Sequence, residues 1–428
     1  MKMKQIICFF ASCVVFCTSS ANAQESVALG LETPKQVRSV TIAELQETAL
    51  KNHPAYKIAE AQIDAERGAK LQAGLRPNPT TRYEAEEVGA GGTAGKQGVV
   101  FEREFGGEAR RRLLVRSHSQ AIEKLNWDKE IAVAKIRNDV RIAAYRLLIA
   151  QKKVELYKRL LDLAQASESS AGQAMLAGSV EISKLNFIQL QNQTRQIKLS
   201  LTEELNAQKA AEKKLLVLLG DPNGSLGVVA DDPESLGEQE AFDENATLDD
   251  LFERSPEIAR LCAEIEEKKA ALDYERAPKR EFSIEGGVFY DFDDKKALAQ
   301  AGVGVPIRIN DRNQGNIRRA TAEFFLAQRE LEREKLKLRA DFAAIYADYQ
   351  SAREETSSYK KEILPDLESY FTMSRQAYEQ GEIGFLELNL ARSSYVEAQV
   401  NYLDALERLA ESIVKIEGAM LERSLEAN

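Results

Sequence analysis

The sequence repeats itself after about 200 residues, and this repeat is the strongest constraint on its fold. Three pairs of segments show it: His53-Pro54 and Ser255-Pro256, Arg76-Pro77 and Ala277-Pro278, and the runs Gln173–Gly178 and Gln376–Gly381. The two copies are offset by 201 to 203 residues. Solenoid units are far shorter, at about 20–50 residues. We therefore expect a duplicated half-molecule, in which each half contains the same elements in the same order.

Residues 1–23 have the pattern of a secretory signal peptide. Lys2 and Lys4 precede the apolar stretch Ile6–Phe16, and Ala21-Asn22-Ala23 forms a small-residue cleavage site. The apolar stretch is shorter than the roughly 20 residues that span a bilayer. Acylation of Cys13 or Cys17, as in a lipoprotein, is an open alternative. Residues 24–40 are expected to form an N-terminal extension.

Composition excludes several classes of protein. Only Cys262 would remain after the signal is removed, so no intramolecular disulfide can form. The net charge of −10 disfavours nucleic acid as a partner. No later segment has the long apolar run of a transmembrane helix. Entry into an outer membrane as a β-barrel stays possible, because the sequence signal of a barrel is much weaker.

Each half is expected to contain a short helix, a strand pair, a very long helix, a turn and a medium helix. The predicted boundaries are residues 41–219 for the first repeat, 220–246 for a Gly/Asp/Pro-rich linker and 247–428 for the second repeat. Arg110–Ala174 contains no proline and only one glycine. As one helix it would be about 98 Å long. Helices of this length must pack against neighbours.

Apolar residues spaced four and three apart follow both long helices. The first stripe is Ile136, Val140, Ala143, Leu147, Ala150, Val154, Tyr157, Leu161 and Ala164. The second is Leu338, Phe342, Ile345, Tyr349, Ala352, Thr356, Tyr359 and Ile363. This heptad-like spacing predicts packing against nearly parallel helices. Pro365 is expected to kink the second long helix.

The lengths of the other helices predict how they pack beside the long ones. Val180–Leu219 with Pro256–Ala277, and Gly384–Arg423 with Pro54–Gly74, each nearly match one long helix. We expect two shorter helices, stacked end to end, to run beside each long helix. The linker would then join the halves at mid-height.

Two segments in each half alternate like strands. They are Thr80–Val88 and Gly98–Phe105, joined by the glycine-rich loop Gly89–Gly95, and a second pair within about residues 281–306. Phe282, Ile284 and Val288 share one face of their strand, whereas Ser283 and Glu285 share the other. Strands of this length with one apolar face suit a membrane barrel.

Four strands per chain predict an oligomer. A barrel in lipid must close, and it needs at least about eight strands. Two chains would leave almost no lumen, whereas three would give twelve strands and an open channel. We therefore expect a homotrimer. The alternative is an ordinary solvent-facing hairpin at the end of a coiled-coil scaffold.

Several segments of the chain resemble a known family. Ala73–Pro79 before a strand and Phe101–Arg110 after one are similar to the TolC-like outer-membrane efflux proteins, in particular the heavy-metal (CzcC-type) branch. Val305–Asn316 and Tyr378–Gly381 in the second half resemble it too. The branch often has a Gly-Gly-Lys-Arg-like run where this chain has Gly106-Gly107-Glu108-Ala109-Arg110.

The resemblance implies a mainly α protein with a small β part. Three chains would form a 12-stranded outer-membrane β-barrel on a long periplasmic α-barrel. The ends of the helical hairpins, around Gly178 and Gly381, would bind a periplasmic adaptor, which links the channel to a proton-driven (RND-type) inner-membrane pump. Heavy-metal cations or other small toxic compounds would be exported. A protein-secretion duct of type I and a non-channel periplasmic scaffold are the alternatives.

Two groups of charged residues are candidate functional sites. Acidic residues on the polar strand faces would be tripled into rings in a trimer and would favour cations. They are Glu84, Glu86, Glu102, Glu104, Glu285 and Asp291. At the periplasmic end, Glu387 follows Gly381 by six residues and corresponds by position to Lys184. Three copies of each could hold the channel closed.

Nothing in the sequence predicts a catalytic site or a bound metal or cofactor. The chain has two histidines, His53 and His118, and one cysteine outside the signal. These are too few ligands to make a dedicated soft-metal site a good prediction. The loop Gly89–Gly95 lacks the Walker pattern and precedes a strand rather than a helix. We expect no catalytic residues, no cofactor and no resident metal.

Overall fold

The computed structural model describes residues 39–92, 94–176 and 184–421. The predicted signal peptide, most of the predicted N-terminal extension and the first hairpin turn at Gly178 lie outside the described residues. A short parallel pair, β1 (Ser39–Val40) with β4 (Val228–Val229), joins the start of the described chain to the linker.

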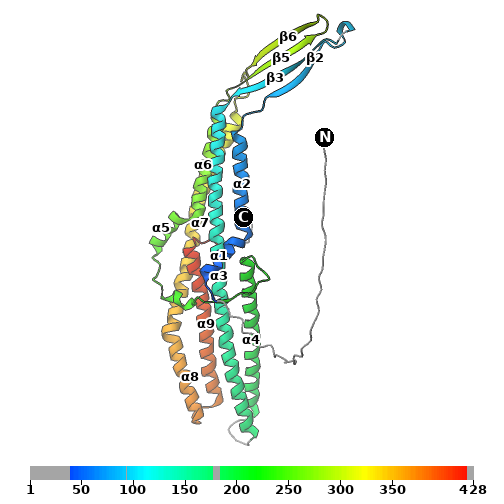
Figure 1. The fold of residues 1–428 in the computed structure, drawn as a ribbon. Coiled ribbons are helices and arrows are strands. Elements are labelled where there is room, and N and C mark those ends of the chain that lie inside the picture. The colour runs from blue at the N-terminus through cyan, green and yellow to red at the C-terminus, as the bar shows by residue number, and fades with distance from the viewer. Residues whose placement is uncertain (1–38, 93, 177–183, 422–428) are drawn as a thin grey trace, which may run out of the picture. The chain divides into compact units, whose positions relative to one another are not determined.

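The two halves contain the same elements in the same order (Figure 1). The first half has α1 (Ile42–Asn52), α2 (Pro54–Gly74), β2 (Thr80–Glu86), β3 (Lys96–Gly106), α3 (Glu108–Leu176) and α4 (Lys184–Leu218). The second has α5 (Glu244–Arg254), α6 (Pro256–Arg276), β5 (Glu281–Asp291), β6 (Lys296–Gly304), α7 (Gln314–Ser358), α8 (Leu364–Glu379) and α9 (Phe385–Glu417). The prediction of a mainly α, duplicated fold with a small β part is confirmed. The prediction of one short helix per half missed α1 and α5.

Proline and capping residues fix the starts of α2 and α6. Pro54 occupies the first turn of α2, where its missing N–H costs nothing, and His53 caps the helix. The Nδ1 atom of His53 accepts a hydrogen bond from the Ala55 amide at 3.2 Å. In the second copy the hydroxyl of Ser255 accepts from the Ile258 amide at 3.4 Å. The observed bounds of α2 are those predicted.

Helix α3 runs for 69 residues and buries its predicted stripe. Ile136, Val140 and Leu147 are almost completely buried, and so is Ala164. Tyr157 and Leu161, toward the hairpin end, are half-buried. The alanines within the stripe leave room for close approach of neighbouring helices. The coiled-coil-like packing expected from the four–three spacing is therefore present.

The second long helix is interrupted by a π-helical segment, Tyr359–Ile363, immediately before Pro365. The Leu364 amide donates to the Tyr359 carbonyl, five residues back. This wider turn moves the stripe by one residue, so Leu364 packs against the buried Tyr402 and Leu403 and Ile363 is exposed. The prediction that Ile363 continues the buried stripe is wrong for this reason.

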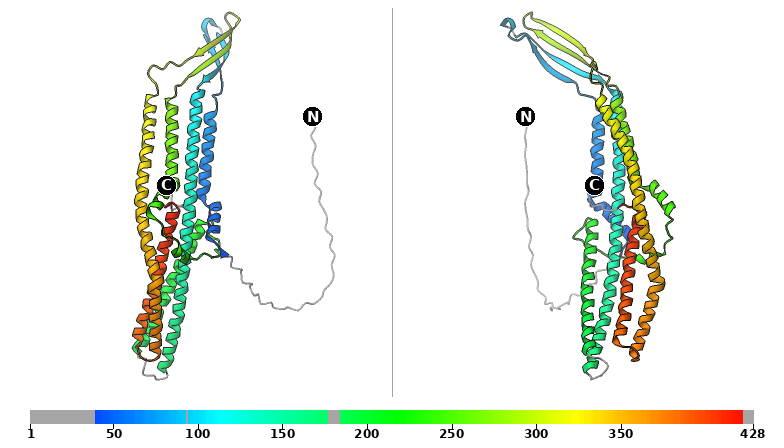
Figure 2. Two further views of the ribbon diagram at one scale, coloured as in Figure 1. Left: turned by 90° about the vertical axis from the view of Figure 1, so that its left-hand side faces the viewer. Right: turned by 180° about the vertical axis from the view of Figure 1, so that it is seen from behind.

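The shorter helices stack in different pairs from those predicted from their lengths. Helices α6 and α9 each contact both α3 and α7, so together they form one column between the two long helices. Helices α2 and α4 both contact α3, and Figures 1 and 2 show α2 above α4. The predicted pairs, α4 with α6 and α9 with α2, are wrong. Length alone does not specify the partner.

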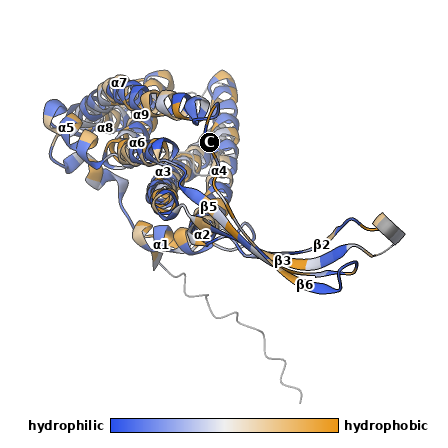
Figure 3. Ribbon diagram, turned by 90° about the horizontal axis from the view of Figure 1, so that it is seen from above, coloured by the Kyte–Doolittle hydropathy of each residue, from blue (hydrophilic) through white to orange (hydrophobic). Residues whose placement is uncertain are grey.

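The four longer strands form one antiparallel sheet in the order β2–β3–β5–β6. Strands β3 and β5, one from each half, pair along their full lengths, from Lys96 opposite Asp291 to Gly106 opposite Glu281. Strands β2 and β6 are the edges. In Figure 3 the sheet extends to one side of the helices, which are seen end-on.

The linker predicted at residues 220–246 wraps around the middle of the helices (Figure 1). On α3, Lys152 pairs with Asp232 at 3.1 Å and with Glu234 at 2.6 Å. On α7, the Tyr346 hydroxyl donates to the Phe242 carbonyl at 2.9 Å. The same linker is thus attached to both long helices.

Helix α9 ends earlier than the predicted Arg423. The side-chain amide of Asn138 on α3 donates to the Gly418 carbonyl at 2.8 Å and also to the Leu421 carbonyl. Ala419 and Met420 have positive φ values. Two carbonyls after the helix are bonded by a neighbouring helix, so the chain leaves the α conformation at Gly418.

We predict that Tyr349→Phe loosens the linker. The hydroxyl of Tyr349 accepts hydrogen bonds from the Phe242 amide at 3.3 Å and from Arg353 at 2.8 Å. Its removal should lower the free energy of unfolding by about 1–2 kcal/mol and make residues 220–246 more sensitive to limited proteolysis. Tyr370→Phe, on an exposed side chain, is the control. Equal proteolysis of both variants would contradict the prediction.

Candidate functional site

The sheet has two faces of opposite character. On one face the exposed side chains are large and apolar, and Val288 and Val303 are 67% and 69% exposed. The remaining exposed apolar residues of this face are Tyr83, Val99, Phe101, Phe105, Phe282, Ile284 and Tyr290. Arg103 interrupts it, with its guanidinium 5.2 Å from the centroid of the Phe105 ring. A sheet in water would normally bury such a face.

The strand register places all six predicted acidic residues on the other face. Glu102 lies opposite Glu285, and Glu104 opposite Ser283. Glu84 and Glu86 on β2 lie opposite Gly98 and Lys96. Asp291 lies opposite Lys96 on one side and Lys296 on the other. Whether this face lines a pore stays a prediction.

Arg82 lies at the centre of the acidic face, and the sequence reasoning missed it. Its guanidinium binds Glu102 and Glu285 at 2.9 Å each and also contacts Glu84. Half of the predicted acidic residues therefore share one cation. The signal was present in the sequence, because Arg82 is two residues from Glu84 and so must share its face.

One of the other acidic positions, Asp291, has local partners. Asp291 accepts hydrogen bonds from the Asp293 and Asp294 amides at 2.9 and 3.1 Å, and so caps the turn between β5 and β6. Lys96 lies opposite Glu86 in the register but pairs with Glu87 at 3.3 Å. Val100 and Phe289 fill the middle of this face and are buried. Arg82 lies opposite Val100, so its charge cluster lies beside these apolar side chains rather than at an end of the face.

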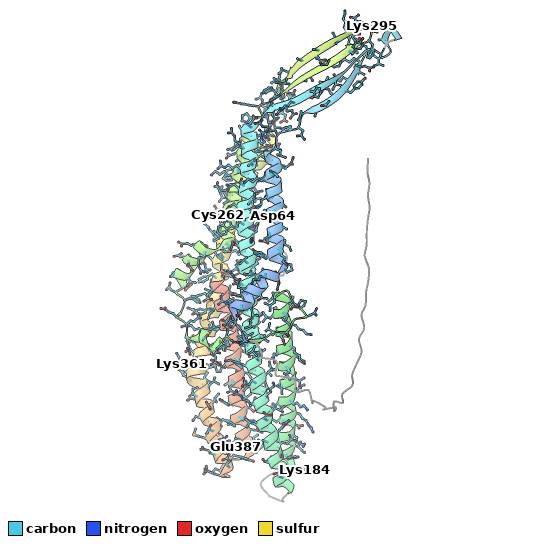
Figure 4. All side chains as sticks on the ribbon, in the orientation of Figure 1. Asp64, Lys184, Cys262, Lys295, Lys361 and Glu387 are labelled. Atoms are coloured by element: carbon cyan, nitrogen blue, oxygen red, sulfur yellow. The ribbon has the colours of Figure 1, made fainter. Side chains whose placement is uncertain are left out.

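The hairpin ends lie at the opposite end of the helices from the sheet, as Figure 4 shows for Lys184 and Glu387. The turn after α8 is closed by Gly381 with φ +75°. The Gly381 amide donates to the Tyr378 carbonyl and the Glu382 amide to the Ala377 carbonyl, which is the Schellman arrangement. Glycine supplies the left-handed residue that this turn requires.

Lys184 is the first residue of α4 and Glu387 is the third of α9, and their charges have opposite electrostatic consequences. Both side chains are exposed in the first turn of a helix. A negative charge there is stabilised by the helix dipole, whereas a positive charge is not. Among the ion pairs of the described residues, none joins these two side chains within one chain. Their role in closing a channel stays a prediction.

Both histidines have structural roles. Burial lowers the pKa of His53, which caps α2 as a neutral acceptor. The Nδ1 atom of His118 lies 2.6 Å from a carboxylate oxygen of Glu66, between α3 and α2. Across the described residues there is no group of three metal-binding side chains, and no described helix is both long enough and apolar enough to cross a bilayer.

Comparisons with known proteins agree with this arrangement. Residues 286–420 match the family model described as outer membrane efflux protein. A relative, the cobalt-zinc-cadmium resistance protein CzcC of Cupriavidus metallidurans, is 24% identical over 353 residues, which are 81% of this chain and 82% of that protein.

Solved structures show the same fold. A membrane protein from Pseudomonas aeruginosa matches with a TM-score of 0.73 at 16% identity, over 90% of this chain and 93% of that one. CusC, described as forming a transmembrane channel, matches with a TM-score of 0.72 at 15% identity, over 95% and 100%. The chain therefore has the fold of these two solved structures. The predicted resemblance to the outer membrane efflux proteins, with CzcC among the relatives, is confirmed.

Proposed function

We propose that three copies of this chain form the outer-membrane channel of a tripartite efflux system. The observation that carries this proposal is the sheet, which combines an exposed apolar face with two unpaired edges, β2 and β6. Lipid accepts the apolar face, but it supplies no partners for the backbone groups of an open edge. The sheet therefore needs other copies of itself.

Closure of the sheet sets the number of copies. Strand β2 of one copy pairs with β6 of the next, and four strands from each of three copies give twelve. Two copies would give eight strands, whose interior is filled by side chains. Three copies leave a lumen lined by the face that carries Glu102, Glu104 and Arg82.

The helices support the same assembly. Helices α2 and α4 form one side of the helical wall, and α7 and α8 form the other. Both sides expose large apolar side chains, including Ile58 and Leu71 on α2 and Phe325 and Leu336 on α7. In the proposed trimer these surfaces cover each other, which continues the wall into a periplasmic α-barrel.

The cargo is proposed to be heavy-metal cations or other small toxic compounds. The support comes from CzcC, whose name refers to cobalt, zinc and cadmium resistance. The chain acts as a duct and not as an enzyme. Its hairpin ends, near Gly381 and the predicted Gly178, bind a periplasmic adaptor protein that connects to a proton-driven RND-type pump. The protein thus lies in the outer membrane with a long periplasmic portion.

Native mass spectrometry of the detergent-purified protein tests the assembly. We predict a trimer that fractionates with outer membranes. A stable monomer found in the periplasmic fraction would instead support the scaffold alternative. Loss of metal tolerance on deletion of the gene supports efflux, whereas loss of a secreted protein with unchanged tolerance would support a secretion duct.

We predict that the charges around Arg82 set ion selectivity. Arg82→Gln removes the cation shared by Glu84, Glu102 and Glu285, so cation selectivity in planar bilayers should rise. Glu102→Gln with Glu104→Gln should lower it. Arg254→Gln, exposed on α5, is the charge-matched control. Reversal potentials that do not move in opposite directions for the two changes would contradict the prediction.

We predict that Glu387 helps to close the periplasmic end. Glu387→Ala should raise the conductance of the closed channel, since the carboxylate can no longer pair with Lys184 of an adjacent hairpin. Glu382→Ala, on an exposed residue of the same turn, is the control. An unchanged closed-state conductance in Glu387→Ala would exclude the pairing.

A further inference from the structure

We propose that a pocket at the base of the sheet binds the phosphate group of a phospholipid from the periplasmic leaflet. The pocket lies where β3 passes into α3, close to the start of β5. Its volume is about 420 Å³. The lipid source rests on the proposed position of the sheet in the outer membrane, whereas the affinity for phosphate rests on the pocket alone.

The pocket is rich in positive charge. Five basic side chains line it: Arg76, Arg103, Arg110, Arg111 and Lys279. Three acidic side chains are also present. One of them, Glu108, lies 3.5 Å from Arg111 and 3.7 Å from Arg76. Glu275, just outside the lining, also contacts Arg110 at 3.4 Å, so an excess of one positive charge remains, and it favours an anion.

Arg110 gives the pocket a buried donor without a partner. Its side chain is only 9% exposed, and its guanidinium stacks 4.1 Å from the centroid of the Tyr274 ring. The Nη2 atom reaches Glu275 at 3.4 Å. The Nη1 atom has no hydrogen-bond partner among the described residues. Buried guanidinium donors are costly to leave unpaired, and an anion in this pocket would supply the acceptor.

The backbone adds a second source of positive potential. Helix α3 begins at Glu108, beside the pocket, and the first N–H groups of a helix have no partners within it. Gly106 and Gly107 precede it with φ values of +91° and +72°. A Cβ atom on Gly106 would lie 2.0 Å from the Arg280 carbonyl oxygen. Glycine thus lets α3 start directly against β5.

The surroundings favour a lipid over a free phosphate. Arg103 and Phe105 line the pocket and also belong to the apolar face. Phe105 stacks on Phe282 of β5, with 5.7 Å between the ring centroids. A headgroup in the pocket would therefore continue into acyl chains lying along the apolar face. The lining residues come from β3, the starts of α3 and β5, and the ends of α2 and α6, but not from β2 or β6, so pairing of those edges leaves the pocket accessible.

The second repeat does not reproduce this site. The residue before α7 is Asn313, whose side-chain amide donates to the Glu275 carbonyl at 2.9 Å. The third residue of α7, which corresponds to Arg110 as the third residue of α3, is Asn316. Its side-chain amide donates to the side-chain oxygen of Asn313 at 2.8 Å. Each copy of the chain would hold one lipid of this kind.

Native mass spectrometry with added short-chain lipids tests the inference. The full-length purified protein is titrated with phosphatidylglycerol, with diacylglycerol and with glycerol phosphate. We expect phosphatidylglycerol to bind most tightly, and Arg110→Gln to weaken it about tenfold, as expected for one charge-assisted hydrogen bond. Arg103→Gln, on the rim of the pocket, tests the site if Arg110→Gln fails to fold. Arg112→Gln, exposed in the same turn of α3, should bind as the unchanged protein does.

The outcomes separate the possible sources and the possible failures. Equal binding of diacylglycerol, or binding that neither pocket variant weakens, would overturn the inference. Glycerol phosphate binding as tightly as the lipid would overturn the lipid source and support an anion site. Failure of lipid binding in a trimer that conducts ions would leave the proposed channel intact.

Discussion

The pairing of β3 with β5 is the constraint on which the rest of the structure depends. It joins the two halves through a continuous antiparallel ladder of eleven residue pairs. Only Gly107 separates β3 from α3, and four residues separate α6 from β5. The ladder therefore brings α3 of the first repeat and α6 of the second side by side and leaves β2 and β6 as edges. The duplicated halves could not form separate sheets and still give this wall.

Apolar packing and ion pairs occur together in the middle of the helical wall, the region here called the waist. The waist combines apolar clusters from α1, α3 and α4 and from α5, α7 and α9 with ion pairs between α3 and α9, such as Arg141 with Glu417 at 2.6 Å. The sheet has few such contacts, and its charge is shared among carboxylates through Arg82. The helical part is therefore held by its own packing, whereas the contacts that the sheet lacks would come from the proposed assembly.

Local signals in the sequence predicted local structure well. Pro54 and the prolines after Gly74 determined both ends of α2, and the alternation of Phe282, Ile284 and Val288 determined the faces of β5. The four–three stripe predicted which face of α3 is buried. The order of the helices and strands could be predicted from the repeat, because the same sequence signals occur in the same order in both halves.

Predictions that depended on long-range choices were less accurate. The lengths of the shorter helices fit several stacking arrangements, and only contacts of α6 and α9 with both long helices show which one forms. Ile363 fits the stripe until the π-helical turn adds a residue. The sequence prediction considered only the acidic residues of the polar strand face, so it missed Arg82 on the same face. No pattern in the sequence predicts that Arg110 is buried, since its burial depends on Tyr274 and Glu275, more than 160 residues away.

The bonds from Asn138 to the carbonyls of Gly418 and Leu421 have a consequence for folding. They join residues 280 or more positions apart, and the waist they complete also includes β1, β4 and the linker. The α3–α4 hairpin is local in sequence and can form early. The waist cannot complete its packing until the end of α9 has been synthesised. Contacts of such sequence separation form late and slowly. An incomplete chain would therefore keep its apolar waist open, and this is the stage at which it most needs protection from aggregation.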